Sequence, residues 1–478
     1  MAEELTPEIC VIGGGPGGIA LAEAAAEAEV SVVLIEKATL GGANLLSGTV
    51  PTRALVAAAD TYEALRAGPA MGVSGAPLQV NLGKVRDHIA AVTEAAAAAV
   101  TAERLTALGV RVIAATGRFT DERTVVAGDI VIRARHTVLA VGALPAIPDL
   151  PGLADVEVMT AASGFDLSRK PAHLLMLGAG AHALALAQAY CRLGIDTSII
   201  DAGATLPDED PELSAIVVER LKADGVGMRT GATISSIARR RGGVRITVVD
   251  ATDGEVAVDG SHVMAVGGRT PDVADLSLSA AGIDHGPTGI VVDERLRTSN
   301  HNVYAIGDAV DGPALAGRAA EEGRRLFHAL IHGRRFSREA KGVPAVSATD
   351  PQIASVGFSE ADARRHYRQI RVLRFPFSEI DLAQAERAPA GVIKVVTTMA
   401  GEILGVAIVG RDAGELIAPW SLAIANRLPV TALADFPVPY PSRSAIAARV
   451  AATFPGPGLT RAWSQRIIAL FRQPGRSR

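Results

Sequence analysis

The sequence predicts an α/β protein with two doubly wound, Rossmann-like domains of parallel sheet, followed by an α+β C-terminal domain. A pattern of strand, glycine-rich turn, alanine-rich helix and second strand occurs over residues 8–36 and again over 173–201. Short apolar runs that alternate with helical stretches favour parallel doubly wound sheets. From residue 343 the pattern changes to apolar runs that indicate an antiparallel sheet. The 478 residues also exceed what a single core contains.

The first unit contains a glycine-rich turn with the spacing of a phosphate-binding loop. A buried strand over 8–12 precedes Gly13, Gly15 and Gly18, and the strand after the helix ends at Glu36. The first glycine permits a tight turn, the second lets the backbone approach a pyrophosphate, and the third allows close packing of helix on strand. The helix N-terminus adds amide donors and a favourable dipole. We expect this loop to bind a nucleotide, with Glu36 accepting both hydroxyls of an adenosine ribose.

The second unit repeats this design. A buried strand leads into Gly178, Gly180 and Ala183, and the next strand ends at Asp201, the expected ribose acceptor. A carboxylate at this position repels the phosphate of NADP, and residues 202–212 contain no arginine to replace it. NAD(H) is therefore favoured over NADP.

Segments outside the two loops also carry secondary-structure patterns. Residues 88–108 read as a long alanine-rich helical stretch, and residues 124–140 and 244–266 as alternating short strands. His182, in the second loop, is predicted to be a solvated loop residue rather than a catalyst. The C-terminal sheet is predicted from residues 343–349, 352–358, 391–398 and 401–410, with helical stretches over 359–367 and 415–428 around it.

Composition and cysteine usage exclude several classes. The net charge of −4 gives no support to a nucleic-acid partner. No apolar run is long enough to cross a bilayer, and the N-terminus lacks the basic start of a signal peptide, so a cytoplasmic protein is expected. The two cysteines, Cys10 and Cys191, lie in apolar segments without metal-ligand spacing, so we expect small buried hydrophobes and no metal site.

Further segments complete a pattern that resembles the FAD-dependent pyridine nucleotide–disulfide oxidoreductases, the family of lipoamide dehydrogenase, glutathione reductase and mercuric reductase. Residues 352–358 and 406–417 are similar to that family's dimerisation domain. The resemblance implies FAD at the first loop, a pyridine nucleotide at the second, and a homodimer whose catalytic site is shared between chains. The segments that carry the rest of the likeness are HTVLAVGALPAIPDLPG (136–152), AVGGRTPD (265–272), VYAIGDAV (303–310) and ALAGRAAEEG (314–323).

The resemblance also implies domain bounds and cofactor contacts. It gives an FAD-binding domain split over 1–152 and 286–342, an NAD-binding domain over 153–285, and an interface domain over 343–458. Asp308 is expected to bond the ribitol chain of FAD. The other residues that it assigns to cofactor binding are Pro16, Gly17, Lys37, Gly42, Ala140, Gly142, Gly268, Arg269, Gly307 and Ala316.

The chain departs from the family at the redox cysteines. The family has a CxxxxC disulfide after a glycine pair, followed by a proline and a lysine. Here Gly42 and Pro51 set the register, so that Asn44 replaces the outer thiol and Thr49 the inner one. Dithiol chemistry needs a thiolate that attacks sulfur and is regenerated, which neither an amide nor a hydroxyl provides. The sequence therefore predicts that the protein does not reduce disulfides.

Other catalytic groups of the family are also replaced. Tyr440 and Ala445 stand for the histidine base and its glutamate, and a tyrosine, with an ordinary pKa of about 10, donates a proton rather than accepting one at neutral pH. Arg53 stands for the flavin-side lysine, whose glutamate partner aligns with Ala185. Two readings of Arg53 are open: it stabilises negative charge on reduced flavin, or it pairs with a local carbonyl.

The retained loops predict an FAD-dependent NADH oxidoreductase that passes electrons directly from flavin to a small acceptor, quinone-like or another non-disulfide oxidant. One alternative is a soluble transhydrogenase-like activity, because that branch of the family resembles this chain in having threonine at the inner position. A second alternative is a pseudo-enzyme that keeps FAD and acts as a binding or assembly partner, since several catalytic positions are lost together. The catalytic candidates are Arg53, Thr49, Asn44 and Tyr440.

The last twenty residues predict a basic amphipathic helix. Residues 459–478 carry five arginines and no acidic residue, and Trp463, Ile467 and Leu470 fall on one helical face. Two readings are open: the helix lies on the inner face of an anionic membrane as a peripheral contact, or it docks on its own dimer.

Overall fold

The computed structural model describes residues 3–75, 77–250, 254–312, 317–334 and 342–455. The chain forms two compact units, Met1–Asp350 and Pro351–Arg478. Ala316 and the helix expected over 459–478 lie outside the described residues. Both therefore stay predictions.

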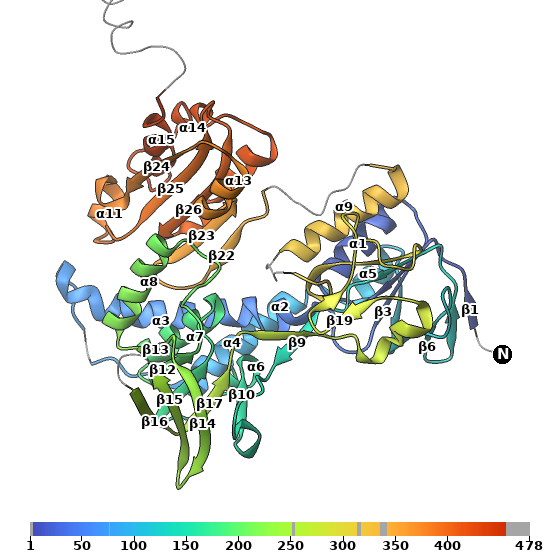
Figure 1. Ribbon diagram of the computed structural model, residues 1–478, viewed down its shortest axis with the longest axis horizontal. Helices are drawn as coiled ribbons and strands as arrows, with labels where there is room; N and C mark the ends of the chain where they lie inside the picture. The colour runs from blue at the N-terminus through green and yellow to red at the C-terminus, as the bar shows by residue number, and fades with distance from the viewer. Residues whose placement is uncertain (1–2, 76, 251–253, 313–316, 335–341, 456–478) are drawn as a thin grey trace, which may run out of the picture. The chain divides into compact units, whose positions relative to one another are not determined.

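The first parallel sheet has five strands in the order β21-β8-β2-β3-β4, all parallel. Helix α1 (Pro16–Glu27) connects β2 to β3, and α9 (Arg318–His332) lies beside it (Figure 1). The two helices approach closely because both carry glycine: a Cβ on Gly323 would lie 2.3 Å from the carbonyl oxygen of Gly17. The strands of the sheet, in the order given, are Val303–Ala305, His136–Leu139, Ile9–Ile12, Val32–Glu36 and Arg111–Ala114.

Several helices lie between β3 and β4. The single stretch predicted over 88–108 is wrong, because the structure has α4 (Leu82–Ala97) and a separate α5 (Ala102–Ala107). The break occurs where Thr101 caps α5 by accepting a hydrogen bond from the backbone nitrogen of Arg104. The elements that precede α4 are α2 (Gly42–Leu46), α3 (Thr49–Ala67) and the short 3₁₀ helix η1 (Gly68–Met71).

The second parallel sheet has the same architecture as the first, with strand order β10-β17-β11-β12-β13. Helix α7 (Ala181–Arg192) connects β11 to β12, and α8 (Pro211–Asp224) connects β12 to β13. The prediction of two doubly wound, Rossmann-like halves is therefore confirmed. The strands, in the order given, are Val158–Thr160, His262–Ala265, His173–Leu177, Asp196–Asp201 and Gly227–Thr230, and α6 (Ala161–Gly164) follows β10.

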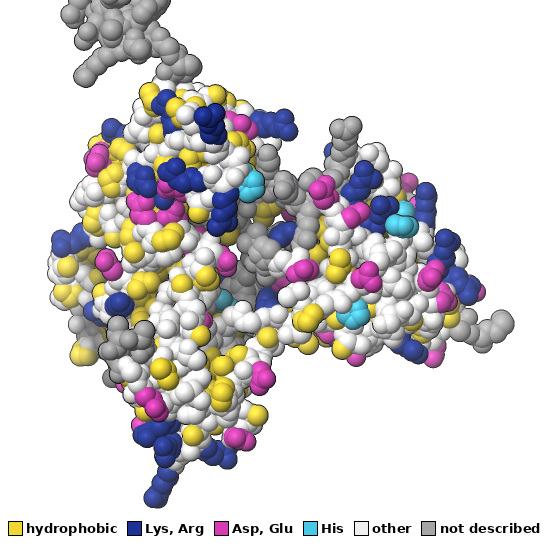
Figure 2. Space-filling model, in the orientation of Figure 1, with side chains coloured by type: hydrophobic (Ala, Val, Ile, Leu, Met, Phe, Trp, Pro, Cys, Tyr) yellow, Lys and Arg dark blue, Asp and Glu magenta, His cyan; other side chains and the backbone are white. Residues whose placement is uncertain are grey.

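Each half also carries a small sheet built from a meander. In the first half its order is β1-β7-β6-β5, and in the second it is the antiparallel β14-β15-β16. Figure 2 shows Lys and Arg side chains gathered at the tip of the β14–β15 hairpin, where residues 239–241 are all exposed arginines. The strands are Glu3–Leu5, Ile130–Ile132, Val125–Ala127 and Gly117–Phe119 in the first half, and Thr233–Arg240, Gly243–Asp250 and Gly254–Gly260 in the second.

Two antiparallel strands, β9 (Ala143–Ala146) and β18 (Gly268–Pro271), carry the chain from the first half to the second and back. After β18 the side chains of Leu276, Leu278 and Ile283 pack in the core of the first half, with Cys10. The chain has thus rejoined the first half before residue 286. The intervening short elements are η2 (Leu153–Asp155), η3 (Ala274–Leu276), η4 (Leu278–Ala281), β19 (His285–Gly286), β20 (Gly289–Ile290) and η5 (Gly307–Ala309).

The unit Pro351–Arg478 contains an antiparallel sheet with neighbouring strands β23-β26-β25-β24. Strand β26 (Ile403–Gly410) is buried at nearly every position, so it lacks the alternation of a strand with one wet face. Trp420 and Phe377 are fully buried in the core beside it. Strand β24 (Ile370–Pro376) was absent from the predicted set. Strand β22 (Ala345–Ser347) precedes this unit in the chain. The other strands of the unit are β23 (Gln352–Gly357) and β25 (Val392–Thr398), and the helices are α10 (Glu360–His366), η6 (Phe377–Glu379), α11 (Asp381–Ala385), α12 (Ala413–Leu416), α13 (Ala418–Ala425), α14 (Thr431–Ala434) and α15 (Ala445–Ala452).

Candidate dinucleotide-binding and catalytic site

The first glycine-rich loop joins β2 to α1 in a conformation that only glycine adopts well. Gly13 has φ +110°, and a Cβ there would lie 2.4 Å from the carbonyl oxygen of Ala140. Gly15 is the N-cap of α1, and no side chain caps the helix. The amides of the first helical turn have no partner within the helix, so they are available to a phosphate. The loop fits a pyrophosphate.

The acidic residue at the end of each second strand holds the glycine-rich loop of its own half. Glu36 accepts hydrogen bonds from the backbone nitrogens of Gly14, at 2.6 Å, and Ala38, at 2.8 Å. Asp201 makes the same pair of contacts, with Ala179 at 2.7 Å and Gly203 at 2.6 Å. Each carboxylate oxygen has further lone pairs. The two acids can therefore shape the loops and still accept from a ribose.

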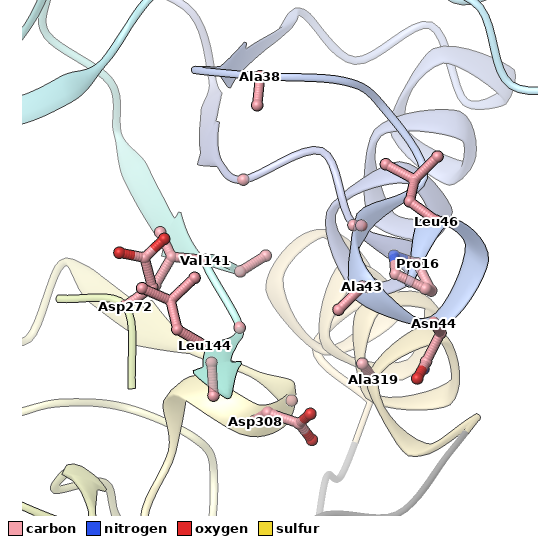
Figure 3. A pocket seen from close by; sticks show the side chains of 18 of the residues that line it. Pro16, Ala38, Ala43, Asn44, Leu46, Val141, Leu144, Asp272, Asp308 and Ala319 are labelled. Atoms are coloured by element: carbon pink, nitrogen blue, oxygen red, sulfur yellow. The ribbon is translucent and has the colours of Figure 1, made fainter. Parts of the chain in front are cut away.

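A cavity of about 340 Å³ opens beside the first loop. Figure 3 shows Asp272, Val141 and Leu144 on one side of it, and Ala43, Asn44 and Leu46 of α2 on the other. The tertiary structure thus brings together residues from six separate parts of the chain. The predicted residues that line the cavity are Gly13, Gly15, Pro16, Gly17, Glu36, Lys37, Gly42, Asn44, Ala140, Gly142, Arg269, Gly307 and Asp308.

Some predicted residues do not line this cavity. Gly18 is buried beneath the loop, where a Cβ would lie 2.0 Å from the carbonyl oxygen of Gly13. Gly268 is exposed on β18, beside Arg269. Thr49 and Arg53 lie on α3 outside the cavity lining.

Asp308 is held by contacts that the sequence did not reveal. Arg269 pairs with it at 3.3 Å and also donates to the carbonyl oxygen of Ala143 at 2.9 Å. Glu322, which is buried, accepts from the backbone nitrogen of Gly307 at 2.8 Å and pairs with Arg318 at 2.7 Å. Glu322 lies in residues 314–323, a segment that already carried the family resemblance, so the sequence offered it as a candidate site residue. Its contact with the backbone nitrogen of Gly307 could not be predicted from the sequence.

Lys37 faces two carboxylates from the connection after β18. Its Nζ lies 3.0 Å from Asp272 and 3.2 Å from Asp275. These partners raise the pKa of Lys37, although desolvation, the largest single effect, acts in the opposite direction. Lys37, the residue after β3, is therefore tied to the segment that returns from the second half.

The second loop repeats the geometry of the first. Gly178 has φ +123°, and a Cβ there would lie 1.8 Å from the carbonyl oxygen of Val266. Gly180 is the N-cap of α7, and the position of its missing Cβ has no heavy atom within 4 Å. Ala183 is fully buried under the helix. This open backbone at a helix N-terminus fits a second pyrophosphate.

Asn44 and Thr49, the residues that the sequence predicts at the positions of the family's two thiols, form a hydrogen-bonded polar pair. Thr49 Oγ1 donates to Asn44 Oδ1 at 3.4 Å. Arg53, one helical turn along α3, is half-buried. Within the described part of the chain no hydrogen bond or ion pair of its guanidinium is found. Nothing in these contacts favours the reading in which Arg53 pairs with a local carbonyl.

His182 is not a solvated loop residue, so that prediction is wrong. It lies in the first turn of α7, partly buried, with Nε2 2.9 Å from the hydroxyl of Thr52 on α3. Desolvation, with a smaller contribution from Arg269, lowers the pKa of His182 to about 4. The imidazole is therefore neutral at physiological pH. Sequence distance hid the contact, because 130 residues separate the two partners.

Both cysteines lie in surroundings that disfavour the reactive thiolate form. Cys10 is fully buried in β2, where desolvation raises the pKa of its thiol to about 12. Cys191, on α7, is half-buried and donates to the carbonyl oxygen of Asp224 at 3.2 Å, and burial raises its pKa too. A protonated thiol is a poor nucleophile.

Tyr440 belongs to the unit Pro351–Arg478, where its side chain is 84% exposed. A hydrogen bond to Asp381 raises the pKa of its hydroxyl above the ordinary value. Ala445 begins α15. Within this unit Tyr440 therefore keeps its proton at neutral pH.

Two parallel sheets, each with a glycine-rich loop at a helix N-terminus and an acidic residue at the next strand end, define a class of protein that binds two dinucleotides. Comparison with known proteins makes the assignment specific. Residues 7–323 match the family described as pyridine nucleotide-disulphide oxidoreductase, and residues 343–449 match its dimerisation domain. The chain belongs to this family.

Individual relatives agree with this assignment. The chain is 32% identical to a mercuric reductase of Acidithiobacillus ferrooxidans, over 90% of this chain and 80% of that protein. It is 33% identical to a dihydrolipoyl dehydrogenase of Bacillus subtilis, over 87% of this chain and 89% of that protein. Among solved structures, LpdA from Mycobacterium tuberculosis has a TM-score of 0.85 at 27% identity, covering 94% of this chain and 99% of that one.

A further solved structure shows the fold alone. The HOCl-induced flavoprotein disulfide reductase RclA from Escherichia coli has a TM-score of 0.81 at 22% identity, covering 94% of this chain and all of that one.

The family establishes a flavin-dependent pyridine nucleotide oxidoreductase that uses FAD and a pyridine nucleotide. The dimerisation domain supports a homodimer. No helix in the described ranges is long and apolar enough to span a membrane.

Proposed function

We propose that the protein is an NADH oxidoreductase in which electrons pass directly from FAD to a small non-disulfide acceptor, a quinone or a similar oxidant. The observation that carries the proposal is the pair of Asn44 and Thr49, hydrogen-bonded at 3.4 Å where the family has its disulfide. Dithiol relay chemistry needs a thiolate at each of these positions. The amide and the hydroxyl can be neither oxidised to a disulfide nor reduced from one.

The remaining thiols support the same conclusion. Cys10 is sealed in the first parallel sheet, and its raised pKa keeps the thiol protonated. Cys191 is engaged with a carbonyl oxygen on α8. Neither can take over the role of a redox cysteine, because the thiolate is the form that attacks sulfur. The relatives named dihydrolipoyl dehydrogenase and mercuric reductase thus share the scaffold, and this chain uses it without a sulfur relay.

The chain's own residues supply binding and electrostatics. Bound FAD supplies the redox chemistry, accepting a hydride from NADH and giving electrons to the acceptor. Arg53 provides a permanent cation on α3 that favours negative charge developing nearby. Asp201 selects NADH, because its carboxylate accepts ribose hydroxyls and repels a phosphate. Tyr440 holds its proton and, in the homodimer that the family implies, donates it to a reduced acceptor.

The test is anaerobic mixing of the FAD-loaded protein with NADH, followed by a panel of acceptors. Rapid bleaching of the flavin absorbance and rapid reoxidation by a soluble quinone are expected. Lipoamide and glutathione disulfide should not reoxidise the flavin above the rate without acceptor. The matched control is the double variant Asn44→Cys/Thr49→Cys, which restores the CxxxxC spacing in the same scaffold. Efficient turnover of a disulfide by the natural protein would refute the proposal.

The same experiment separates the two alternatives. A transhydrogenase-like protein, the reading suggested by Thr49 at the inner position, would transfer hydride to an oxidised nucleotide analogue faster than to any quinone. A pseudo-enzyme would show unchanged flavin absorbance after equilibration with NADH.

The peripheral membrane contact predicted from residues 459–478 is an independent proposal, tested by comparing vesicle sedimentation of the full chain and of a chain ending at residue 458.

A further inference from the structure

A hydrogen bond joins α3, in the first Rossmann-like half, to the start of α7, the helix that follows the second glycine-rich loop. Thr52, on α3, is buried with 4% of its surface exposed, and His182 lies in the first turn of α7. The distance from Thr52 Oγ1 to His182 Nε2 is 2.9 Å. The two residues belong to different Rossmann-like halves, so the bond links α3 of the first half to the helix start beside the second loop.

The direction of this bond follows from the other contact of the threonine. Thr52 Oγ1 donates its only proton to the carbonyl oxygen of Gly48, at 2.7 Å. It must therefore accept from His182, which places a proton on Nε2. Because burial keeps the imidazole neutral, Nδ1 carries a lone pair. No donor to Nδ1 is found among the residues that the structure describes.

A second contact links the same two helices farther along. Arg192, at the end of α7, pairs with Asp60 of α3 at 2.9 Å and with Asp224 of α8 at 2.9 Å. Its side chain is 3% exposed. Helix α7 is thus tied to α3 near both of its ends. The family's ion pair at this junction cannot form here, since Ala185 stands for its glutamate.

We infer that His182 is a positioning residue for the nicotinamide half of the pyridine nucleotide. Thr52 holds the ring through Nε2, and Nδ1 accepts a hydrogen bond from the carboxamide N–H of that half. The inference rests on the proposed use of NADH. It places a neutral hydrogen-bond acceptor, His182 Nδ1, at the junction of α3 and α7, where the family has an ion pair.

The experiment compares two ligands that differ only in the nicotinamide. Binding of NAD⁺ and of ADP-ribose to the FAD-loaded protein is measured by calorimetry. His182→Ala should weaken NAD⁺ about tenfold, the change expected when one hydrogen bond is lost, and should leave ADP-ribose within about twofold. His182→Gln keeps an amide donor for Thr52 but has no acceptor in the place of Nδ1, so it should show the same selective loss. Thr61→Ala, at an exposed threonine of the same helix α3, is the matched control and should bind both ligands normally.

The outcomes decide between a ligand contact and a purely structural one. Restoration of NAD⁺ affinity by His182→Gln, equal weakening of both ligands, or unchanged NAD⁺ affinity in His182→Ala would each overturn the inference. Flavin content of each variant reports folding, and Gln serves where Ala does not fold. Because calorimetry needs no turnover, the result stands apart from the proposed function. That proposal fails instead if NADH does not bleach the natural protein's flavin.

Discussion

Thr49 Oγ1 donates a hydrogen bond of 3.4 Å to Asn44 Oδ1, which joins the first residue of α3 to the middle of the short helix α2. The five-residue separation is that of the family's CxxxxC pair. The spacing of the family's redox pair is therefore kept, while the two side chains have no redox chemistry of their own. An alcohol and an amide at this distance orient each other and remain unchanged through reduction and reoxidation.

The first prediction concerns the spectrum of the reduced protein. NADH-reduced natural protein should show no long-wavelength charge-transfer band, because no thiolate is available at position 49. The double variant Asn44→Cys/Thr49→Cys should gain such a band. A band in the natural protein, or none in a variant shown to carry the reduced dithiol by thiol titration, would contradict the assigned register. Anaerobic absorbance spectra provide the measurement.

The second prediction separates the two glycine-rich loops. Gly13→Ala places a Cβ 2.4 Å from a backbone oxygen and should yield protein without FAD. Gly178→Ala, with a clash at 1.8 Å, should keep FAD and lose NAD⁺ binding. Gly180→Ala meets no atom within 4 Å, so its melting temperature should not change, while NAD⁺ and ADP-ribose should both weaken because the methyl group enters the pyrophosphate space. Retained NAD⁺ binding in Gly178→Ala would count against the second loop.

The third prediction concerns the choice of nucleotide. The natural protein should bind NADH in preference to NADPH, because the Asp201 carboxylate accepts ribose hydroxyls and repels a phosphate. Asp201→Asn should weaken NADH about tenfold, the scale of a lost charge-assisted hydrogen bond, and reduce the discrimination against NADPH. FAD content should stay constant. Steady-state kinetics with both nucleotides measures the ratio, and a preference for NADPH in the natural protein would show the assignment to be wrong.

The fourth prediction concerns the buried ion cluster on α7. Arg192→Met leaves the carboxylate of Asp224, which is 3% exposed, without its buried cation, although Arg220 still contacts it at 2.7 Å. Loss of one partner from a buried pair typically lowers the free energy of unfolding by about 3 kcal/mol. Arg192→Lys keeps a charge and should lose less. Urea unfolding of the FAD-loaded protein tests this, and equal midpoints for natural and Met proteins would exclude the effect.

The fifth prediction is a pH dependence that originates at His182. The ordinary pKa of 6.5 holds in the unfolded chain, and burial with the nearby Arg269 lowers the pKa to about 4 in the folded one. Between these values the unfolded chain binds more protons, so the free energy of unfolding falls as pH drops from 6.5 toward 4. Glutamine does not titrate. The stability of the natural protein relative to His182→Gln should therefore decrease between pH 7 and pH 5 in denaturant melts, and a constant difference would contradict the lowered pKa.

Local chemical pattern explains which parts of the fold were predictable. The loops at Gly13 and Gly178 were recognised because the turn, the helix start and the acidic strand end follow one another within thirty residues, so short-range sterics determine them. The helix expected over 88–108 was divided at Thr101, because a capping hydroxyl competes with helix continuation. The sequence pattern did not predict strand β24, because its two arginines interrupt the apolar run.

The sequence by itself determined the class of cofactors and the presence of an amide and a hydroxyl at positions 44 and 49, because both depend on which atoms stand at positions close together along the chain. Only the tertiary structure decided how those positions cooperate. The bond from Thr52 to His182, the support of Gly307 by Glu322, and the cluster around Arg192 all join separate elements. Such contacts depend on how helices and sheets pack, and packing is a property of the whole core rather than of any local pattern.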